Sequence, residues 1–118
     1  MKATLHKNLA SPDETRMFEK GRVDLVRLDG DVVGRFMLEP GWHWEEHVKP
    51  MVGTDWCEVE HYQVVQSGRL HVKESDGAEF EIGPGEVAHV APGHDAWVVG
   101  DEPFVAIDWG EAGKYAKR

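Results

Sequence analysis

The sequence has a single cysteine among its 118 residues and no long hydrophobic run. With Cys57 alone, no disulfide can form within the chain, and small secreted domains usually depend on such bonds. The first residues, MKATLHKNLA, also lack the continuous apolar stretch of a secretion signal. No segment approaches the roughly 18 consecutive apolar residues that indicate a membrane span. We therefore predict a cytoplasmic protein with no membrane partner.

Basic residues are scarce, with 13 against 22 acidic ones, which gives a formal net charge of −9. Nucleic-acid backbones and anionic membrane surfaces bind basic patches, so we predict no nucleic-acid partner. Hydrophobic residues make up 41% of the chain, as in ordinary globular proteins. No repeat, low-complexity segment or linker divides the sequence. We predict one domain over residues 1–118, with a core over roughly 21–110.

Glycine and proline recur at short intervals, and the segments between them are rich in Val, Phe and Ile. This spacing is typical of an antiparallel sandwich or barrel. Residues alternate as in half-buried strands: Phe36 and Leu38 share one face, while Arg35 and Glu39 share the other. The predicted strands cover residues 22–28, 32–39, 58–66, 69–74, 79–82, 86–91, 96–99 and 104–109.

Only residues 11–20 carry helix signals, with Ser11 as the N-cap and Pro12 at the first helical position. The Asp29-Gly30 pair predicts a tight hairpin between the first two strands. Eight strands without crossover helices predict an all-β antiparallel fold, a jelly roll or small barrel, with at most one short helix.

Histidines recur at marked positions relative to these turns. Five residues separate Gly41 from His47, and six residues separate His61 from Gly68. Further on, the run GPGEVAHVAPGHD contains His94. These segments, roughly 38–68 and 77–99, resemble the two motifs of the cupin superfamily, in particular its small single-domain bacterial members. The resemblance implies an antiparallel jelly-roll barrel with a histidine-lined pocket at its mouth.

The sequence departs from the cupin motifs at three places, and one of them is the gap between Lys49 and His61, which is longer than the usual three or four residues. The second histidine of the first motif falls on Lys49, which cannot bind a metal while charged. His94 directly follows Gly93, two residues before the usual histidine position. A second alignment places Asp55 and Cys57 in the paired histidine positions, since three residues separate Cys57 from His61. We favour the first alignment because it preserves the Pro-Gly turn, and the second stays open.

The resemblance implies that His47, His61 and His94 come together as ligands of a divalent transition metal. Cys57 shares a strand face with His61 in our strand prediction and is the predicted fourth ligand. Such a site suits Zn, Fe, Ni or Cu and leaves positions open for substrate or water. We assign no catalytic residue and no other cofactor.

A substrate pocket beside these ligands is predicted from four further residues: Trp56 and Trp97 as walls, with Gln63 and Lys49 as polar groups.

We therefore predict a metal-dependent cupin enzyme of the oxygenase or isomerase type, acting on a small polar organic molecule. The alternative is a non-catalytic binding or sensor cupin without metal, in which the same histidines donate hydrogen bonds. Lys49 favours this alternative, because an ammonium group suits an anionic ligand. The resemblance also implies a homodimer that pairs through edge strands.

Overall fold

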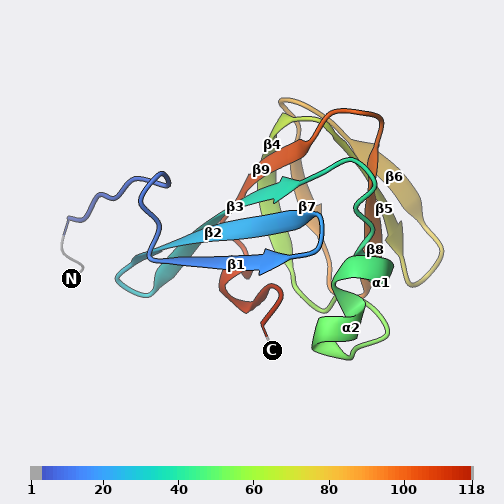
Figure 1. Cartoon of the computed structure of the whole chain (residues 1–118), viewed down its shortest axis with the longest axis horizontal. Coiled ribbons are helices and arrows are strands. Elements are labelled where there is room, and N and C mark those ends of the chain that lie inside the picture. The colour runs from blue at the N-terminus through green and yellow to red at the C-terminus, as the bar shows by residue number, and fades with distance from the viewer. Residues whose placement is uncertain (1–3, 118) are drawn as a thin grey trace.

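The computed structural model describes residues 4–117 and consists mainly of antiparallel β-strands (Figure 1). The strands are β1 (Glu14–Phe18), β2 (Gly21–Leu28), β3 (Asp31–Leu38), β4 (His61–Ser67), β5 (Arg69–Glu74), β6 (Glu79–Ile82), β7 (Val87–Val90), β8 (His94–Val99) and β9 (Phe104–Asp108). The helices are α1 (Trp44–His47), α2 (Lys49–Val52) and the 3₁₀ turn η1 (Ala112–Lys114).

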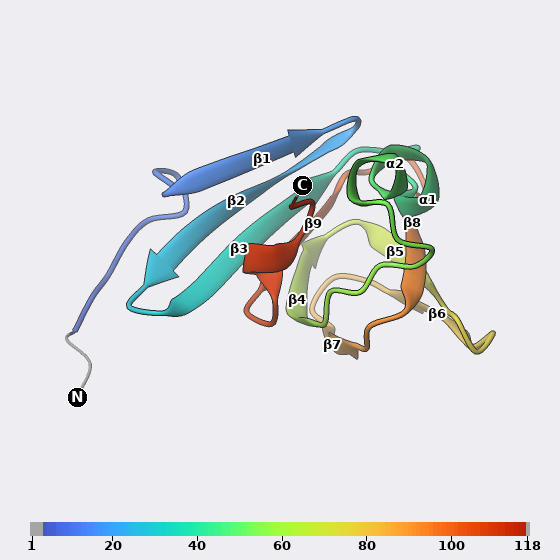
Figure 2. The ribbon, with the colours of Figure 1, turned by 90° about the horizontal axis from the view of Figure 1, so that it is seen from below.

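The strands form two sheets. A six-stranded sheet has the order β1-β2-β3-β9-β4-β7, and a three-stranded sheet has the order β6-β5-β8. Every pairing within them is antiparallel. Figure 2 shows β1, β2 and β3 as one layer that extends beyond the remaining strands. The predicted all-β antiparallel fold is confirmed, although the two sheets are not joined into a closed barrel.

The core lies where the inward faces of the two sheets meet. Phe36 and Leu38 of β3 are buried, and so are Phe104 and Ala106 of β9, which pairs with β3. Leu70 of β5 covers them from the smaller sheet. Burying each large apolar side chain stabilises the fold by roughly 1.5–3 kcal/mol. Toward the ends of the strands, polar side chains take over the inward-facing positions, and the candidate site lies there.

The predicted hairpin at Asp29-Gly30 is confirmed. Leu28 pairs with Asp31 across the turn, and Asp29 and Gly30 have φ angles of 51° and 95°. Two central residues with positive φ give a turn whose twist matches that of the flanking strands. The sequence therefore determines the register of β2 against β3.

Gly68 allows β4 to pass directly into β5. Its φ is +77°, and a Cβ atom there would lie 2.3 Å from the carbonyl oxygen of Pro103. Any other residue would clash with the backbone that leads into β9. This close approach brings the second half of β4 against β9.

The predicted helix over residues 11–20 is wrong, because this segment contains the edge strand β1. Residues 14–18 pair with β2 along one side of their backbone, and their side chains alternate between half-buried and exposed positions. Arg16 also donates hydrogen bonds to the carbonyl oxygens of Gly113 and Tyr115, at 2.7 and 2.8 Å. These tertiary contacts outweigh the local capping pattern.

Two four-residue helices, α1 and α2, occupy a segment in which no helix was predicted. A proline near its start and Gly53 at its end, with φ of 77°, delimit α2. Figure 1 shows the helices beside β8, and the backbone N–H of Val98 donates to the carbonyl of Trp42 at 3.0 Å. Among the described residues, no helix has the length and apolar character needed to cross a membrane.

Candidate metal centre

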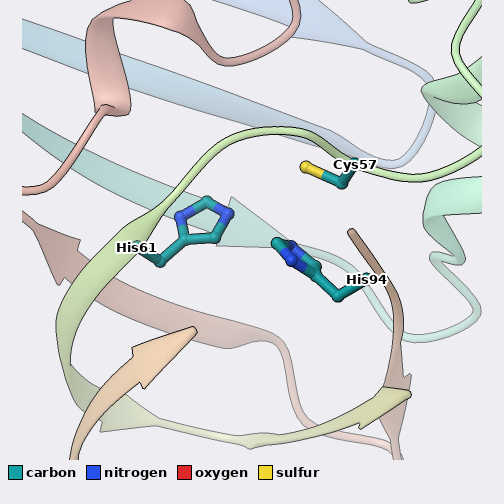
Figure 3. Close-up of side chains that lie close together, drawn as sticks. All are labelled: Cys57, His61 and His94. Atoms are coloured by element: carbon teal, nitrogen blue, oxygen red, sulfur yellow. The ribbon is translucent and has the colours of Figure 1, made fainter. Parts of the chain in front are cut away.

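Three buried side chains from separate parts of the chain converge at the inward ends of β4 and β8. Cys57, His61 and His94 each offer one ligand atom, and these atoms lie within 4.8 Å of one another. Figure 3 shows the three side chains pointing toward a common space. We call this group the inner cluster.

Backbone pairing positions the cysteine. Cys57 lies in the segment before β4 and forms an isolated bridge with His94, the first residue of β8. The backbone N–H of Cys57 donates to the carbonyl of His94 at 2.8 Å, and Gly93 N–H donates to the carbonyl of Cys57 at 2.7 Å. The thiol is therefore held beside His94 by main-chain hydrogen bonds.

Each imidazole in the inner cluster has one nitrogen engaged by the protein. His61 Nδ1 donates to Asp108 Oδ2 at 2.5 Å, and Asp108 is fully buried. His94 Nδ1 donates to the carbonyl oxygen of Ala91 at 2.7 Å. These partners accept hydrogen bonds and so place a hydrogen on Nδ1 of both rings, which makes Nε2 the nitrogen that each ring can offer to a metal. Metal-binding histidines in proteins are typically oriented in this way.

Burial sets the protonation of the cluster. It lowers the pKa of His94 to about 4, with a further contribution from the nearby His61, so the ring is neutral at pH 7. Burial also raises the pKa of the Cys57 thiol to about 12, and the negative charge of Glu58 adds to this effect. Without a cation the thiol therefore stays protonated and unreactive.

The donor set fits a divalent transition metal. Two neutral imidazole nitrogens and one sulfur are ligands that Zn, Fe, Ni and Cu accept, and a cation stabilises the thiolate form of Cys57. Asp108 behind His61 supplies the supporting carboxylate that such sites usually have. Within residues 4–117, no fourth His, Cys, Asp or Glu joins the group. Three protein ligands would leave room for a substrate or water.

Two cavities meet at the inner cluster. The inner cavity, of about 30 Å³, is lined by His61 and His94 but not by Cys57. The outer cavity, of about 230 Å³, is lined by Cys57 but by neither histidine. Trp44 and Tyr115 line both cavities and separate them. The cluster therefore lies in the wall between a small inner space and a larger outer one.

No family model matches the sequence, and no curated protein matches it. Solved structures do resemble it. An oxalate decarboxylase from Lactobacillus farciminis, solved as a formate complex, is 18% identical, with a TM-score of 0.60 over 86% of this chain and 32% of its own. A cupin-like protein from Thermotoga maritima is 19% identical, with a TM-score of 0.55 over 79% of this chain and 70% of its own. A protein with a double-stranded β-helix domain from Klebsiella pneumoniae is 20% identical, with a TM-score of 0.56 over 82% and 76%.

The chain is a small cupin-fold protein. It spans about a third of the length of the oxalate decarboxylase, 32%. At these identities the likeness establishes the fold and not the activity.

Within this fold, His47 lies apart from the inner cluster. Its Nδ1 accepts a hydrogen bond from the backbone N–H of His43 at 3.0 Å, and its Nε2 lies 3.2 Å from a carboxylate oxygen of Glu19. The physical reason is that the chain after the Pro-Gly turn forms α1 instead of a strand, so His47 does not face the cavity. Of the two alignments considered from the sequence, the arrangement agrees with the one that uses Cys57.

The predicted pocket residues lie in three different places. Gln63 is buried and lines the inner cavity with His61 and His94. Lys49 and Trp56 line a separate surface cavity of about 330 Å³. Trp97 does not line the inner cavity: it stacks on His71, with ring centroids 4.5 Å apart. The metal-free alternative requires Lys49 and the histidines to bind one ligand together. In the structure, Lys49 lines a different cavity from His61 and His94.

Sequence reasoning missed four residues at this site. Trp42 and Trp44 line the inner cavity, where Trp56 and Trp97 had been predicted as walls. Asp108 is the last residue of β9 and, like Ala106, it occupies a buried position in the alternating pattern of the strand. A carboxylate at such an inward position is the sequence signal that could have identified it. Tyr115 lies beyond the predicted core, yet it is buried and contacts the His61 ring at a centroid distance of 5.8 Å.

Proposed function

We propose that this protein is a metal-dependent enzyme of the oxygenase or isomerase type, acting on a small polar organic molecule. The observation that carries the proposal is the inner cluster itself: three ligand atoms within 4.8 Å, with the second nitrogen of both histidines already engaged. Such a set is preorganised, and three protein ligands are typical of catalytic metal sites.

Cys57, His61 and His94 would hold the ion, and Asp108 would keep His61 in the required tautomer. A bound divalent ion would supply Lewis-acid activation of a carbonyl or water, or oxygen chemistry if it is redox-active. Zn, Fe, Ni and Cu are the candidates, since all accept nitrogen and sulfur donors.

The outer cavity offers the space for the organic substrate. Its walls are mainly apolar, with Val48, Val52 and Val59, and Cys57 forms part of its boundary. Burial keeps the pKa of Tyr115 well above its usual value, so its phenol stays neutral and retains its proton. One neighbour is an oxalate decarboxylase bound to formate. Small carboxylic acids are therefore the first substrates to test.

Metal content tests the centre. Freshly purified protein, or protein reconstituted with Zn, Fe, Ni or Cu, should hold about one equivalent of ion. In cobalt-loaded protein, the Cys57→Ser variant should lose the sulfur-to-metal absorption band. His47→Ala is the matched control, because His47 lies outside the inner cluster, and it should retain full metal content. Less than about a tenth of an equivalent of every metal, before and after reconstitution, would contradict the proposal.

Filling the outer cavity tests the substrate position. Val52→Trp should abolish turnover of a substrate identified among small carboxylic acids and carbonyl compounds, while its metal content stays unchanged. Val87→Trp is the control, since Val87 is 69% exposed on an edge strand. Full turnover in Val52→Trp would place the substrate elsewhere.

We also propose that the protein forms a homodimer along β1, the edge strand of the six-stranded sheet. Met17 on this strand is 65% exposed and offers an apolar side chain to such a contact. Light scattering coupled to size exclusion should give twice the chain mass of 13.3 kDa. Thr15→Pro should give the monomer mass, whereas a monomeric wild type would contradict the proposal.

A further inference from the structure

Two buried polar atoms in the inner cavity have no hydrogen-bond partner among the described residues: Trp42 Nε1 and Gln63 Oε1. Their residues are only 2% and 5% exposed, and both line the cavity beside His61 and His94. Buried polar groups in native proteins almost always have a partner, because leaving one unpaired is costly. This pair therefore points to a ligand in the cavity.

The orientation of the Gln63 amide follows from its other end. Gln63 Nε2 lies 3.5 Å from Asp108 Oδ2, and this carboxylate already accepts the proton of His61 Nδ1. A carboxylate only accepts hydrogen bonds, so a reversed amide would set two oxygens against each other. Asp108 therefore keeps the amide nitrogen on its side and leaves the carbonyl oxygen free. Beside the Nε2 atoms of His61 and His94, the residues that line the cavity therefore offer one unpaired donor, on Trp42, and one unpaired amide acceptor, on Gln63.

The size of the cavity limits what can bind between these two groups. Its volume is about 30 Å³, and one water molecule needs roughly 10–15 Å³ on this measure. The remaining walls include the apolar side chains of Phe36, Leu70 and Phe104. Only a very small ligand fits.

We propose that the inner cavity binds a small neutral hydroxyl compound, of about two or three non-hydrogen atoms, that accepts a hydrogen bond from Trp42 and donates one to Gln63. Methanol and hydrogen peroxide have this chemistry, and two water molecules replace them when neither is present. An anion of the same size, such as formate, is disfavoured by the Gln63 carbonyl oxygen and by the charge of Asp108 behind it. An apolar atom such as xenon is disfavoured because it leaves both polar groups unpaired.

This site goes beyond the proposed function, since its recognition needs no metal. Its position nevertheless matters for that function. Trp42 and Gln63 orient the small ligand beside the two histidines, while the organic molecule occupies the outer cavity on the side of Cys57. The two cavities would then hold two different reactants on opposite sides of the inner cluster.

Crystals of metal-free, chelator-treated protein test the site directly. In untreated crystals we expect ordered waters within about 3.2 Å of both Trp42 Nε1 and Gln63 Oε1. Soaking with methanol should replace them, whereas formate and pressurised xenon should not enter the cavity. In Gln63→Leu, methanol occupancy should fall about tenfold and xenon should enter, because the acceptor is lost. Trp42→Phe removes the donor instead and should give the same reversal if Gln63→Leu does not fold.

Cys57→Ser separates this inference from the proposed metal centre. Cys57 does not line the inner cavity, so the variant should bind waters and methanol as the wild type does while it loses metal. An inner cavity that is empty, or that takes up xenon or formate in the wild-type protein, would overturn the inference. Unchanged methanol occupancy in both Gln63→Leu and Trp42→Phe would overturn it as well.

Discussion

Two groups of side chains in this protein have the same spacing but different chemistry. In the inner cluster and in a second group, which we call the outer cluster (His43, Glu45 and Asp95), three potential ligand atoms lie within 4.8 Å of one another. In the outer cluster the ligand atoms of His43 and Asp95 are already engaged. His43 Nε2 lies 2.7 Å from Asp95 Oδ2, and the other oxygen of Asp95 accepts from the backbone N–H groups of Glu45 and Ala96, at 3.2 and 2.9 Å.

The inner cluster directs its internal hydrogen bonds away from the common space. His61 and His94 use Nδ1 for Asp108 and for a backbone carbonyl, which leaves both Nε2 atoms and the Cys57 sulfur facing one another. The outer cluster is a set of hydrogen bonds around Asp95 at the start of α1, whereas the inner cluster keeps its ligand atoms free. Proximity of ligand atoms therefore indicates a metal site only where lone pairs remain free.

The largest expected difference between the clusters is in metal affinity. His61→Ala should weaken zinc binding by about 100-fold or more, because one of three ligands is lost. His43→Ala should leave the affinity unchanged. A competition titration with a chromophoric chelator measures both dissociation constants. If His43→Ala weakened binding as strongly as His61→Ala, the metal would belong to the outer cluster and the comparison would fail.

Acid stability should depend on His94. Its pKa is about 4 in the folded protein against an ordinary value of 6.5, so the unfolded chain binds the additional proton between these pH values. Stability should therefore be full above pH 6.5 and decline progressively down to pH 4, by about 3 kcal/mol in total.

Urea unfolding of metal-free protein at several pH values measures this decline. It should largely disappear in His94→Gln and persist in His43→Gln. An equal decline in wild type and His94→Gln would show that other groups govern acid unfolding.

The supporting carboxylates should differ as well. Asp108→Asn should lower zinc affinity by about 10- to 100-fold, because an amide orients His61 less well and no longer strengthens it as a ligand. Asp95→Asn should not change the affinity, since Asp95 supports no residue of the inner cluster. The same chelator competition measures both variants. Equal affinities for Asp108→Asn and wild type would mean that His61 does not need its carboxylate.

The smallest expected effect concerns the outer cluster alone. Asp95→Asn weakens its contact with His43 and one hydrogen bond at the start of α1. We expect a loss of about 1 kcal/mol in the free energy of unfolding, with metal content unchanged. Thermal or urea denaturation measures this cost. A loss of metal in this variant would contradict the separation of the two clusters.

Much of the fold could be predicted because local patterns and tertiary contacts agree. The strands at 69–74 and 79–82 have the predicted bounds, and the Asp29-Gly30 hairpin forms as expected. Residues 11–20 could not be assigned correctly, because their capping pattern favours a helix while pairing with β2 makes them a strand. Nothing local reveals that a partner strand is available.

The site was predicted only in part for the same reason. His61 and Gln63 alternate inward on β4, so their shared cavity follows from strand periodicity. His47 was placed with them on motif spacing, but a helical turn directs it toward Glu19. Asp108 and Tyr115 come from the last part of the chain, and no spacing relates them to His61.

By itself, the sequence determined the all-β character, the main hairpin and the shared inward face of His61 and Gln63. These depend on alternation and turn chemistry, which act over a few residues. Only the tertiary structure decided that Cys57 and not His47 meets the two histidines, and that Asp108 stands behind them. Contacts between distant segments depend on which strands pair and where the chain bends, and this is decided by the energy of the whole packed core.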